Sequence, residues 1–267
     1  MLELPDNGID KGRTGGIALG DGTYFGGIAE GEPLYRFYGY WATGILETEE
    51  QAANAHYDAL SRLPVKGQKR VGDYEWADRN GDGNITTADQ FCLGVTVPPY
   101  TGGFSNDFRY RNFTLSIYMD WAIGHSIYDD AYNRHFYSTY TMNHSLAEEV
   151  KNCWKQPGDD TKLAKFTAND SAWGNDNYNR KANQIFTYKG DYLCLREVSL
   201  QYALSERALR NTPLKGLTVT LSGNNLHYFT AVEGISPEVG TSSTFDGDNY
   251  NNYPPIRRLS LGVKLTF

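Results

Sequence analysis

Apolar and polar side chains alternate along several segments of this chain, which is the pattern of a β-strand with one apolar and one polar face. The longest such run is 113–123, in which every odd position is apolar. A strand of about 11 residues is long for a soluble sheet and matches a strand that crosses a membrane at a tilt. The run 104–110 before it alternates in the same way, and Arg111-Asn112 predicts a tight turn between the two strands.

Alternation returns in three segments of the second half of the chain, 197–204, 217–222 and 258–267. A soluble antiparallel sheet also has one apolar and one polar face, so alternation alone does not distinguish it from a membrane barrel. Long strands that are joined by short turns at one end and by long polar loops at the other favour the barrel. The sequence therefore predicts an all-β protein, and specifically an antiparallel, up-and-down transmembrane β-barrel with two short helices in its loops.

The first third of the chain contains shorter strand signals. Two short strands are predicted at 14–19 and 23–28, because Gly20-Asp21-Gly22 between them is a typical hairpin turn. The aromatic run 35–41 predicts a further strand. The segment 71–77 is expected to be extended, leading into a polar loop.

Two capping boxes, each a Ser or Thr followed three residues later by Gln or Glu, predict the two short helices. The first helix is expected over about 48–60, stopped by Pro64, and the second over about 145–154. The second lies within 124–190, a polar and aromatic connection between two predicted strands. Such a connection is too long for an idle loop, which indicates a functional, extracellular loop.

The stretch 78–89, DRNGDGNITTAD, has the spacing of a calcium-binding loop, with Gly83 at the position that requires a sharp turn. Its oxygen ligands would be Asp78, Asn80, Asp82, the Asn84 carbonyl, Thr86 through a water, and Asp89. The pair of helices that flanks an EF-hand loop is not predicted here. Two interpretations are open: a weak Ca²⁺ site, or an Asp/Asn/Gly turn that keeps its shape without a metal.

Composition and charge narrow the choice of function. The net charge is −7 in 267 residues, so nucleic acid is not an expected partner. The mean hydropathy of −0.56 and the absence of a run of about 18 apolar residues predict no transmembrane helix. Three cysteines stand far apart in the sequence, and their spacing predicts neither a zinc site nor a redox pair.

Two sets of side chains are candidates for contact with a ligand or a pore. The first consists of residues in the long connection that could bind or stack on a ligand, or that could instead be surface and packing residues: His135, Tyr137, Tyr140 and Trp173. The second consists of polar strand residues that would face a barrel lumen, or pair with the plug or across strands: Asp120, Glu197, Arg258 and Lys264. No GxSxG, HExxH or P-loop motif is present, so we expect no catalytic site.

Seven motifs occur in an order that resembles the C-terminal portion of SusC/RagA-type TonB-dependent outer-membrane transporters. They are FYGYWATGIL, ADRNGDGNITTADQ, TGGFSNDFRYRNFTLSIYMDWAIG, YLCLREVSLQYAL, VTLSGNNLHYFT, SPEVG and YPPIRRLSLGVKLTF. The last motif ends on Phe267, and a terminal aromatic residue in an alternating strand is similar to the C-terminal signal of outer-membrane barrels. The resemblance implies a barrel of roughly 22 strands in the bacterial outer membrane.

The resemblance also implies partners and a substrate class. The family imports glycans or peptides, with a SusD-like surface lipoprotein as a lid and the TonB complex as the source of energy. The plug domain, the TonB box and most of the barrel have no counterpart in these residues, and the start, MLELPDNGIDKGR, is not a signal peptide. We therefore expect a fragment that does not transport by itself. The alternative is a secreted, calcium-stabilised, carbohydrate-binding β module.

Overall fold

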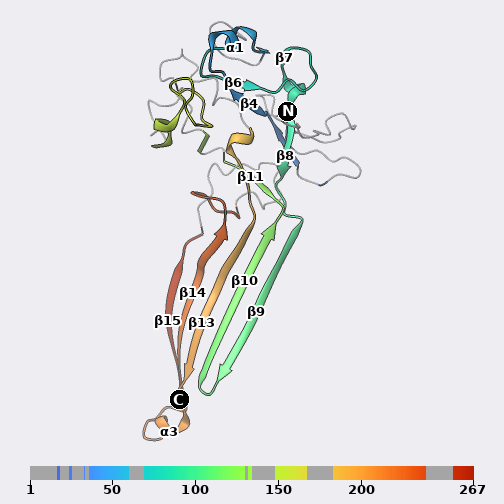
Figure 1. The fold of residues 1–267 in the computed structure, drawn as a ribbon. Coiled ribbons are helices and arrows are strands. Elements are labelled where there is room, and N and C mark those ends of the chain that lie inside the picture. Colours follow the sequence, from blue (N-terminus) through green and yellow to red (C-terminus); the bar gives the residue numbers. More distant parts are fainter. Residues whose placement is uncertain are drawn as a thin grey trace. The chain divides into compact units, whose positions relative to one another are not determined.

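The computed structural model describes residues 17–18, 24–25, 33, 36–59, 69–129, 132–133, 148–166, 183–238 and 255–267. The chain forms two compact units (Figure 1). Unit 1 comprises 1–97, 126–188 and 239–252, and unit 2 comprises 98–125, 189–238 and 253–267. Within the described ranges, no helix has both the length and the apolar character needed to cross a membrane.

Unit 2 is one antiparallel sheet of five strands in the order β15-β14-β13-β10-β9 (Figure 1). The strands are β9 (Tyr100–Tyr110), β10 (Phe113–Ile123), β13 (Tyr192–Ala203), β14 (Gly216–Thr230) and β15 (Arg258–Thr266). Neighbours in the sheet follow one another along the chain, so the predicted all-β, antiparallel, up-and-down fold is confirmed. The tight turn between β9 and β10 is also confirmed, and Arg111 takes a positive φ of 52° in it.

Three of these strands are longer than the sequence predicted, and one of them is β9, which begins at Tyr100 rather than at Phe104. Strand β13 begins at Tyr192 rather than at Glu197, and β14 continues to Thr230 rather than ending at Ser222. The physical reason is a bulge, since the register between β13 and β14 shifts between Leu195 and Glu197. A bulge inserts unpaired residues and changes the phase of the alternation, so the periodic pattern stops there although the strand continues. A short helix, α3 (Glu206–Leu209), lies in the β13–β14 connection.

Unit 1 is built from short strands. One sheet has the order β1-β2-β3-β8, with β1 (Ile17–Ala18), β2 (Tyr24–Phe25), β3 (Arg36–Gly39) and β8 (Phe91–Val95). The others are pairs: β4 (Ala42–Ile45) with β6 (Tyr74–Trp76), β5 (Tyr57–Asp58) with β7 (Asn84–Ile85), and β11 (Ser126–Tyr128) with β12 (Thr187–Lys189). The predicted hairpin is confirmed, because β1 and β2 pair antiparallel. The predicted turn at Gly20–Gly22 lies outside the described residues.

The helices of unit 1 are shorter than predicted. Helix α1 (Glu49–Asn54) has the predicted capping box between Thr48 and Gln51, but it ends well before Pro64. The reason is that the chain turns extended at Ala55 and then pairs as β5 with β7, which removes the following residues from the helix. The second predicted helix is the 3₁₀ helix η3 (Glu148–Asn152), and the start of its capping box lies outside the described residues. Further 3₁₀ turns are η1 (Thr87–Asp89) and η5 (Gln184–Phe186).

Aromatic rings form the core of unit 1. The rings of Tyr74 and Trp76 lie 5.4 Å apart, and those of Tyr40 and Trp76 lie 6.2 Å apart, with all three side chains buried. Such tilted and edge-on pairs add to the free energy of burial. Beside them, the buried Lys69 Nζ donates to the Tyr74 carbonyl (2.8 Å) and lies 3.4 Å from the Asp58 carboxylate. The core therefore fixes β4, β6 and β5, which carry two of the sites described below.

Candidate functional site

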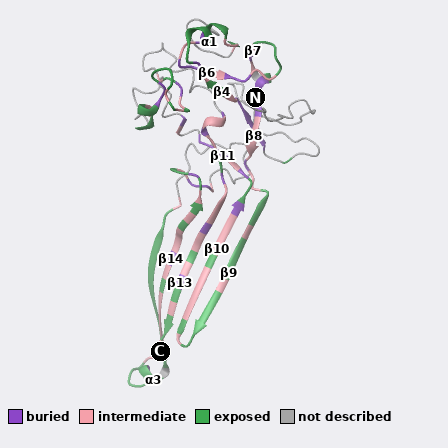
Figure 2. Ribbon diagram, in the orientation of Figure 1, coloured by how far each residue is buried: buried purple, intermediate pink, exposed green. Residues whose placement is uncertain are grey.

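The five-stranded sheet of unit 2 has one face of exposed apolar side chains. Residues directly opposite each other in adjacent strands share a face, so the register assigns every side chain of the sheet. The large apolar residues of this face include Tyr100, Phe104, Phe108, Phe113, Leu200, Leu221, Phe229, Leu259, Leu261 and Val263, all more than a third exposed. Figure 2 shows that exposed residues run along β9 and β15. A monomeric soluble protein rarely leaves such a continuous apolar surface in water. This face therefore requires an apolar partner.

The opposite face of the same sheet is polar. The register places there the four residues that the sequence analysis selected as lumen-facing, namely Asp120, Glu197, Arg258 and Lys264. Glu197 lies opposite Asn224, which in turn lies opposite Arg258, so acid, amide and base follow one another across three strands. Apolar residues on one face and polar residues on the other are what a barrel wall between lipid and water requires. That this face borders a lumen stays a prediction.

Arg196 connects three parts of unit 2 through its guanidinium. It makes two hydrogen bonds of 2.7 Å to the carboxylate of Asp120, and it pairs with Glu238. It also donates to Asn225 Oδ1 (3.0 Å) and to the Tyr228 hydroxyl (3.2 Å). The bulge lets Arg196 and Glu197 both point to the polar face, since relative to β10 it adds one residue between the paired Leu195 and Glu197. We call Arg196 with these four partners the Arg196 cluster.

The Arg196 cluster was not predicted from the sequence. Its one local signal is the doublet Arg196-Glu197, two charged residues in succession within an alternating run. The partner Glu238 lies 42 positions further along the chain. The segment 231–238 is held at a second point as well, because Nε2 of the buried His125 lies 3.0 Å from the Pro237 carbonyl. A carbonyl only accepts, so Nε2 is the donor in this contact.

We expect Arg196→Gln and Asp120→Asn each to destabilise the folded protein by about 1–2 kcal/mol, since each leaves a partly buried charge without its bidentate partner. The double variant should lose less than the sum of the two, because the second change removes a charge that is already unpaired. Unfolding of the protein in urea measures all three. Arg258→Gln on the same face is the matched control, and strict additivity of the first two changes would contradict a coupled cluster.

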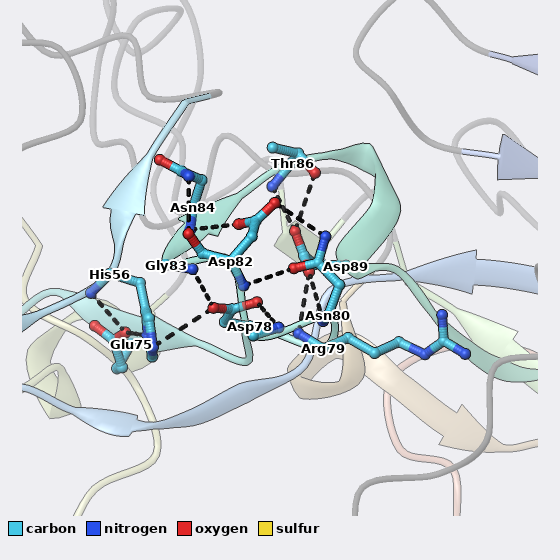
Figure 3. A network of polar contacts seen from close by, with 11 residues as sticks. His56, Glu75, Asp78, Arg79, Asn80, Asp82, Gly83, Asn84, Thr86 and Asp89 are labelled. Carbon is cyan, nitrogen blue, oxygen red and sulfur yellow. Dashed lines mark hydrogen bonds and ion pairs between the residues drawn. The ribbon is translucent and has the colours of Figure 1, made fainter.

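The loop 78–89 is closed by carboxylates that accept hydrogen bonds from the backbone (Figure 3). Asp78 accepts from the N–H groups of Gly81 (2.8 Å) and Gly83 (2.7 Å), and both glycines have a positive φ, of 74° and 79°. Asp82 Oδ1 accepts from Asn84 N (2.7 Å), and this bond, followed by that from the Asn80 side chain, lowers the pKa of the Asp82 carboxyl. The turn geometry therefore needs glycine at both positions.

Asp89, at the end of the loop, is completely buried. Its Oδ1 accepts from the N–H groups of Arg79 (3.0 Å) and Asn80 (3.5 Å), and its Oδ2 accepts from Thr86 N (2.7 Å) and Thr86 Oγ1 (3.1 Å). Thr86 in turn accepts from Ala88 N, which completes the cap of η1. One carboxylate thus ties both ends of the loop together.

A chain of polar contacts anchors the loop to β6. The Glu75 carboxylate accepts from the backbone N–H of His56 (3.2 Å) and also contacts Nδ1 of that ring, while Nε2 lies 3.9 Å from Asp78 (Figure 3). Within the part of the chain that the structure describes, no three His, Cys, Asp or Glu side chains are arranged to hold a metal ion. Calcium binding by the set Asp78, Asn80, Asp82, Asn84, Thr86 and Asp89 stays a prediction.

The long connection 124–190 is described only in part. It contains β11, η3, η5 and β12, which pack in unit 1. The four residues selected there as possible ligand contacts lie outside the described residues: His135, Tyr137, Tyr140 and Trp173. The described part contributes other aromatic side chains, Tyr132, Trp154 and Tyr188, which line a cavity together with Trp41. The sequence analysis did not select these, because they come from segments far apart in the chain.

Comparison with known proteins finds relatives that are all TonB-dependent receptors among those described below. No family model matches the chain. It is 27% identical over 90% of its length to TonB-dependent receptor P3 of Formosa agariphila, and 28% identical over its whole length to TonB-dependent receptor P39 of the same organism. These alignments cover 23% and 27% of the two receptors, so the chain spans about a quarter of the length of the curated relatives it matches.

Solved structures with a similar fold come from a transporter, the RagAB peptide importer. The RagAB peptide importer superimposes on 93% of the chain in its closed-closed state, with a TM-score of 0.63, and on 95% in its open-open state, with a TM-score of 0.62. The sequence identity is 17% in both cases, and 24% of the importer chain is covered, so this likeness concerns the fold alone. The predicted resemblance to SusC/RagA-type TonB-dependent transporters is confirmed.

Proposed function

We propose that this chain forms part of the barrel of a TonB-dependent importer in the bacterial outer membrane, which takes up nutrients such as glycan oligosaccharides or peptides. One observation carries the proposal: five long antiparallel strands have an exposed apolar face and a polar opposite face. Lipid acyl chains are an apolar partner that covers such a face along its whole height. The similarity to a quarter of several TonB-dependent receptors supports it.

The polar face then borders the water-filled interior, where the Arg196 cluster holds the segment 231–238 against the wall. Polar groups on that side select what passes, as in other barrels. The partners that we propose are a SusD-like surface lipoprotein and the TonB complex, which act on the full-length protein. We propose no catalytic role, because the sequence contains no GxSxG, HExxH or P-loop motif.

A secreted, calcium-stabilised, carbohydrate-binding module is the alternative from another class of protein. It would place the apolar face of unit 2 in water, at a cost of roughly 25 cal/mol for each Å² of exposed apolar surface. The exposed apolar face of unit 2, which supports the importer, therefore argues directly against the secreted module.

The proposal is tested by fractionation and uptake. The full-length protein should sediment with the outer membrane and require detergent for extraction. Growth on its nutrient should depend on both the protein and a functional TonB complex, with growth on glucose as the control. Extraction by buffer alone, or uptake that continues without TonB, would refute the importer.

A further inference from the structure

The segment 231–238 follows β14 and returns to the polar face of unit 2. Gly234, in its middle, is exposed and has a positive φ of 81°, which suits a turn at the surface. Glu238, at its end, reaches the guanidinium of Arg196, which also holds Asp120. Asp120 pairs with Cys194 inside the sheet, so the segment ends over the sheet and not beyond it.

Two carboxylates share the Arg196 guanidinium, and they are bound differently. Asp120, on the neighbouring strand, accepts two hydrogen bonds of 2.7 Å, which is the stronger, bidentate arrangement. Glu238 accepts from Nη2 alone, and the side chains of this pair are 25% and 28% exposed. If Glu238 leaves, Arg196 keeps its bidentate partner, so no charge is left unpaired on the sheet. Its departure therefore costs less than breaking an isolated ion pair.

The second point that holds the segment is a single hydrogen bond from His125. Nε2 of this buried ring lies 3.0 Å from the Pro237 carbonyl, whereas Nδ1 is buried and has no hydrogen-bond partner in the described part of the chain. The ring is fixed in place, because it packs on Gly190, where an added Cβ would collide with it. A buried polar atom without a partner costs free energy. The position of the segment therefore depends mainly on the charge of Glu238.

Cys194 marks the part of the sheet that the end of the segment covers. It lies on the polar face, between Asp120 and Tyr228 of the adjacent strands. Both neighbours are partly exposed, but Cys194 is completely buried. The Glu238 carboxylate is close enough to act on the thiol electrostatically. The accessibility of Cys194 should therefore report whether Glu238 is in place.

We propose that the segment 231–238 is a latch with two positions on the polar face of unit 2. In the closed position, which is the one observed, Glu238 pairs with Arg196. In the open position Glu238 is in water, Arg196 keeps Asp120, and Cys194 is uncovered. Gly234 provides the turn about which the latch moves, because a Cβ there would meet no atom within 4 Å. Opening widens the space along the polar face. In an importer this space belongs to the lumen, and that placement rests on the proposed function.

The test measures the reaction of Cys194 with N-ethylmaleimide in the full-length, detergent-solubilised protein, by mass spectrometry of its peptide. Glu238→Gln keeps the shape of the side chain and removes its charge, so it should raise the labelling rate of Cys194 about tenfold or more. Glu233→Gln, at an exposed position of the same latch, is the matched control and should leave the rate within about twofold. Cys153, buried in the core of unit 1, reports global unfolding and should label equally slowly in all three proteins.

Salt provides a second measurement that needs no substitution in the latch. Raising NaCl from about 0.1 M to 1 M shortens the Debye length from about 10 Å to 3 Å, which weakens a partly exposed ion pair. Labelling of Cys194 in the unaltered protein should therefore become about twofold to fivefold faster. In Glu238→Gln the same salt should have no effect on the rate, because the charge is already absent. N-ethylmaleimide is uncharged, so salt does not steer the reagent itself.

The latch is refuted if Glu238→Gln labels Cys194 as slowly as the unaltered protein does, or if salt leaves the rate of the unaltered protein unchanged. If Cys194 and Cys153 become faster together in Glu238→Gln, the variant has lost its fold, and the salt dependence of the unaltered protein decides. If labelling responds as expected while fractionation and TonB-dependent uptake fail, the latch stands and the importer is wrong. If those two assays succeed while labelling does not respond, only the latch is wrong.

Discussion

Ile117→Arg is expected to destabilise the folded protein by about 2–4 kcal/mol, whereas Ser116→Arg, one position away, should change its stability by less than about 1 kcal/mol. Ile117 lies in the middle of β10 on the apolar face, opposite Val198. Ser116 lies on the polar face, between Asp107 of β9 and Ser199 of β13, where a guanidinium meets a carboxylate and water. Both substitutions introduce an arginine, at neighbouring positions of β10, and the new side chain meets the apolar face in one variant and the polar face in the other.

The measurement is urea unfolding of the full-length protein refolded into phospholipid vesicles, followed by its heat-dependent mobility on gels. Leu261→Arg, on the apolar face of β15, should behave like Ile117→Arg if it lies at membrane depth. Equal losses for Ile117→Arg and Ser116→Arg would mean that no bilayer covers the apolar face. That result would favour the soluble module over the importer.

The strands of unit 2 show which strand bounds a two-residue alternation predicts correctly and which it does not. Strand β10 has the predicted bounds because its alternation is unbroken, and each odd residue from Phe113 to Ile123 lies on the apolar face. Strand β13 was predicted only from Glu197 because Arg196, which is an extra residue relative to β10, reverses the phase of the alternation. A two-residue period detects a strand through its regular part and stops at a bulge. The apolar and polar faces of the sheet could thus be predicted from the sequence, whereas the role of Arg196 could not.

Sites that are assembled from distant segments of the chain could not be predicted from the sequence either. The capping box at Thr48 was predictable since its partner Gln51 lies three positions away, but the end of the helix depends on pairing between β5 and β7. The cavity places Trp41 with Trp154, more than a hundred positions apart, and nothing local marks either residue as part of a site. Local contacts leave local signals, whereas tertiary contacts require the fold.

The loop 78–89 gives the second large effect, through Asp89. Asp89→Ala should raise the hydrogen-exchange rates of the Arg79 and Thr86 amides at least thirtyfold, because it removes the buried acceptor of both N–H groups. Four donors then lose a charged acceptor, which we expect to cost the loop about 2–4 kcal/mol of local stability. Asp82→Ala, on the exposed side of the same loop, is the matched variant and should have a much smaller effect in the absence of metal.

Repeating both measurements in calcium and in chelator separates the two interpretations of the loop. If Ca²⁺ binds the oxygens of Asp78, Asp82 and Asp89, calcium should slow exchange in the unaltered protein and have no such effect in Asp82→Ala, which lacks a ligand. If the backbone hydrogen bonds alone hold the loop, exchange is the same in calcium and chelator, and only Asp89→Ala is fast. A normal exchange rate in Asp89→Ala would contradict both, because the buried carboxylate closes the loop in either case.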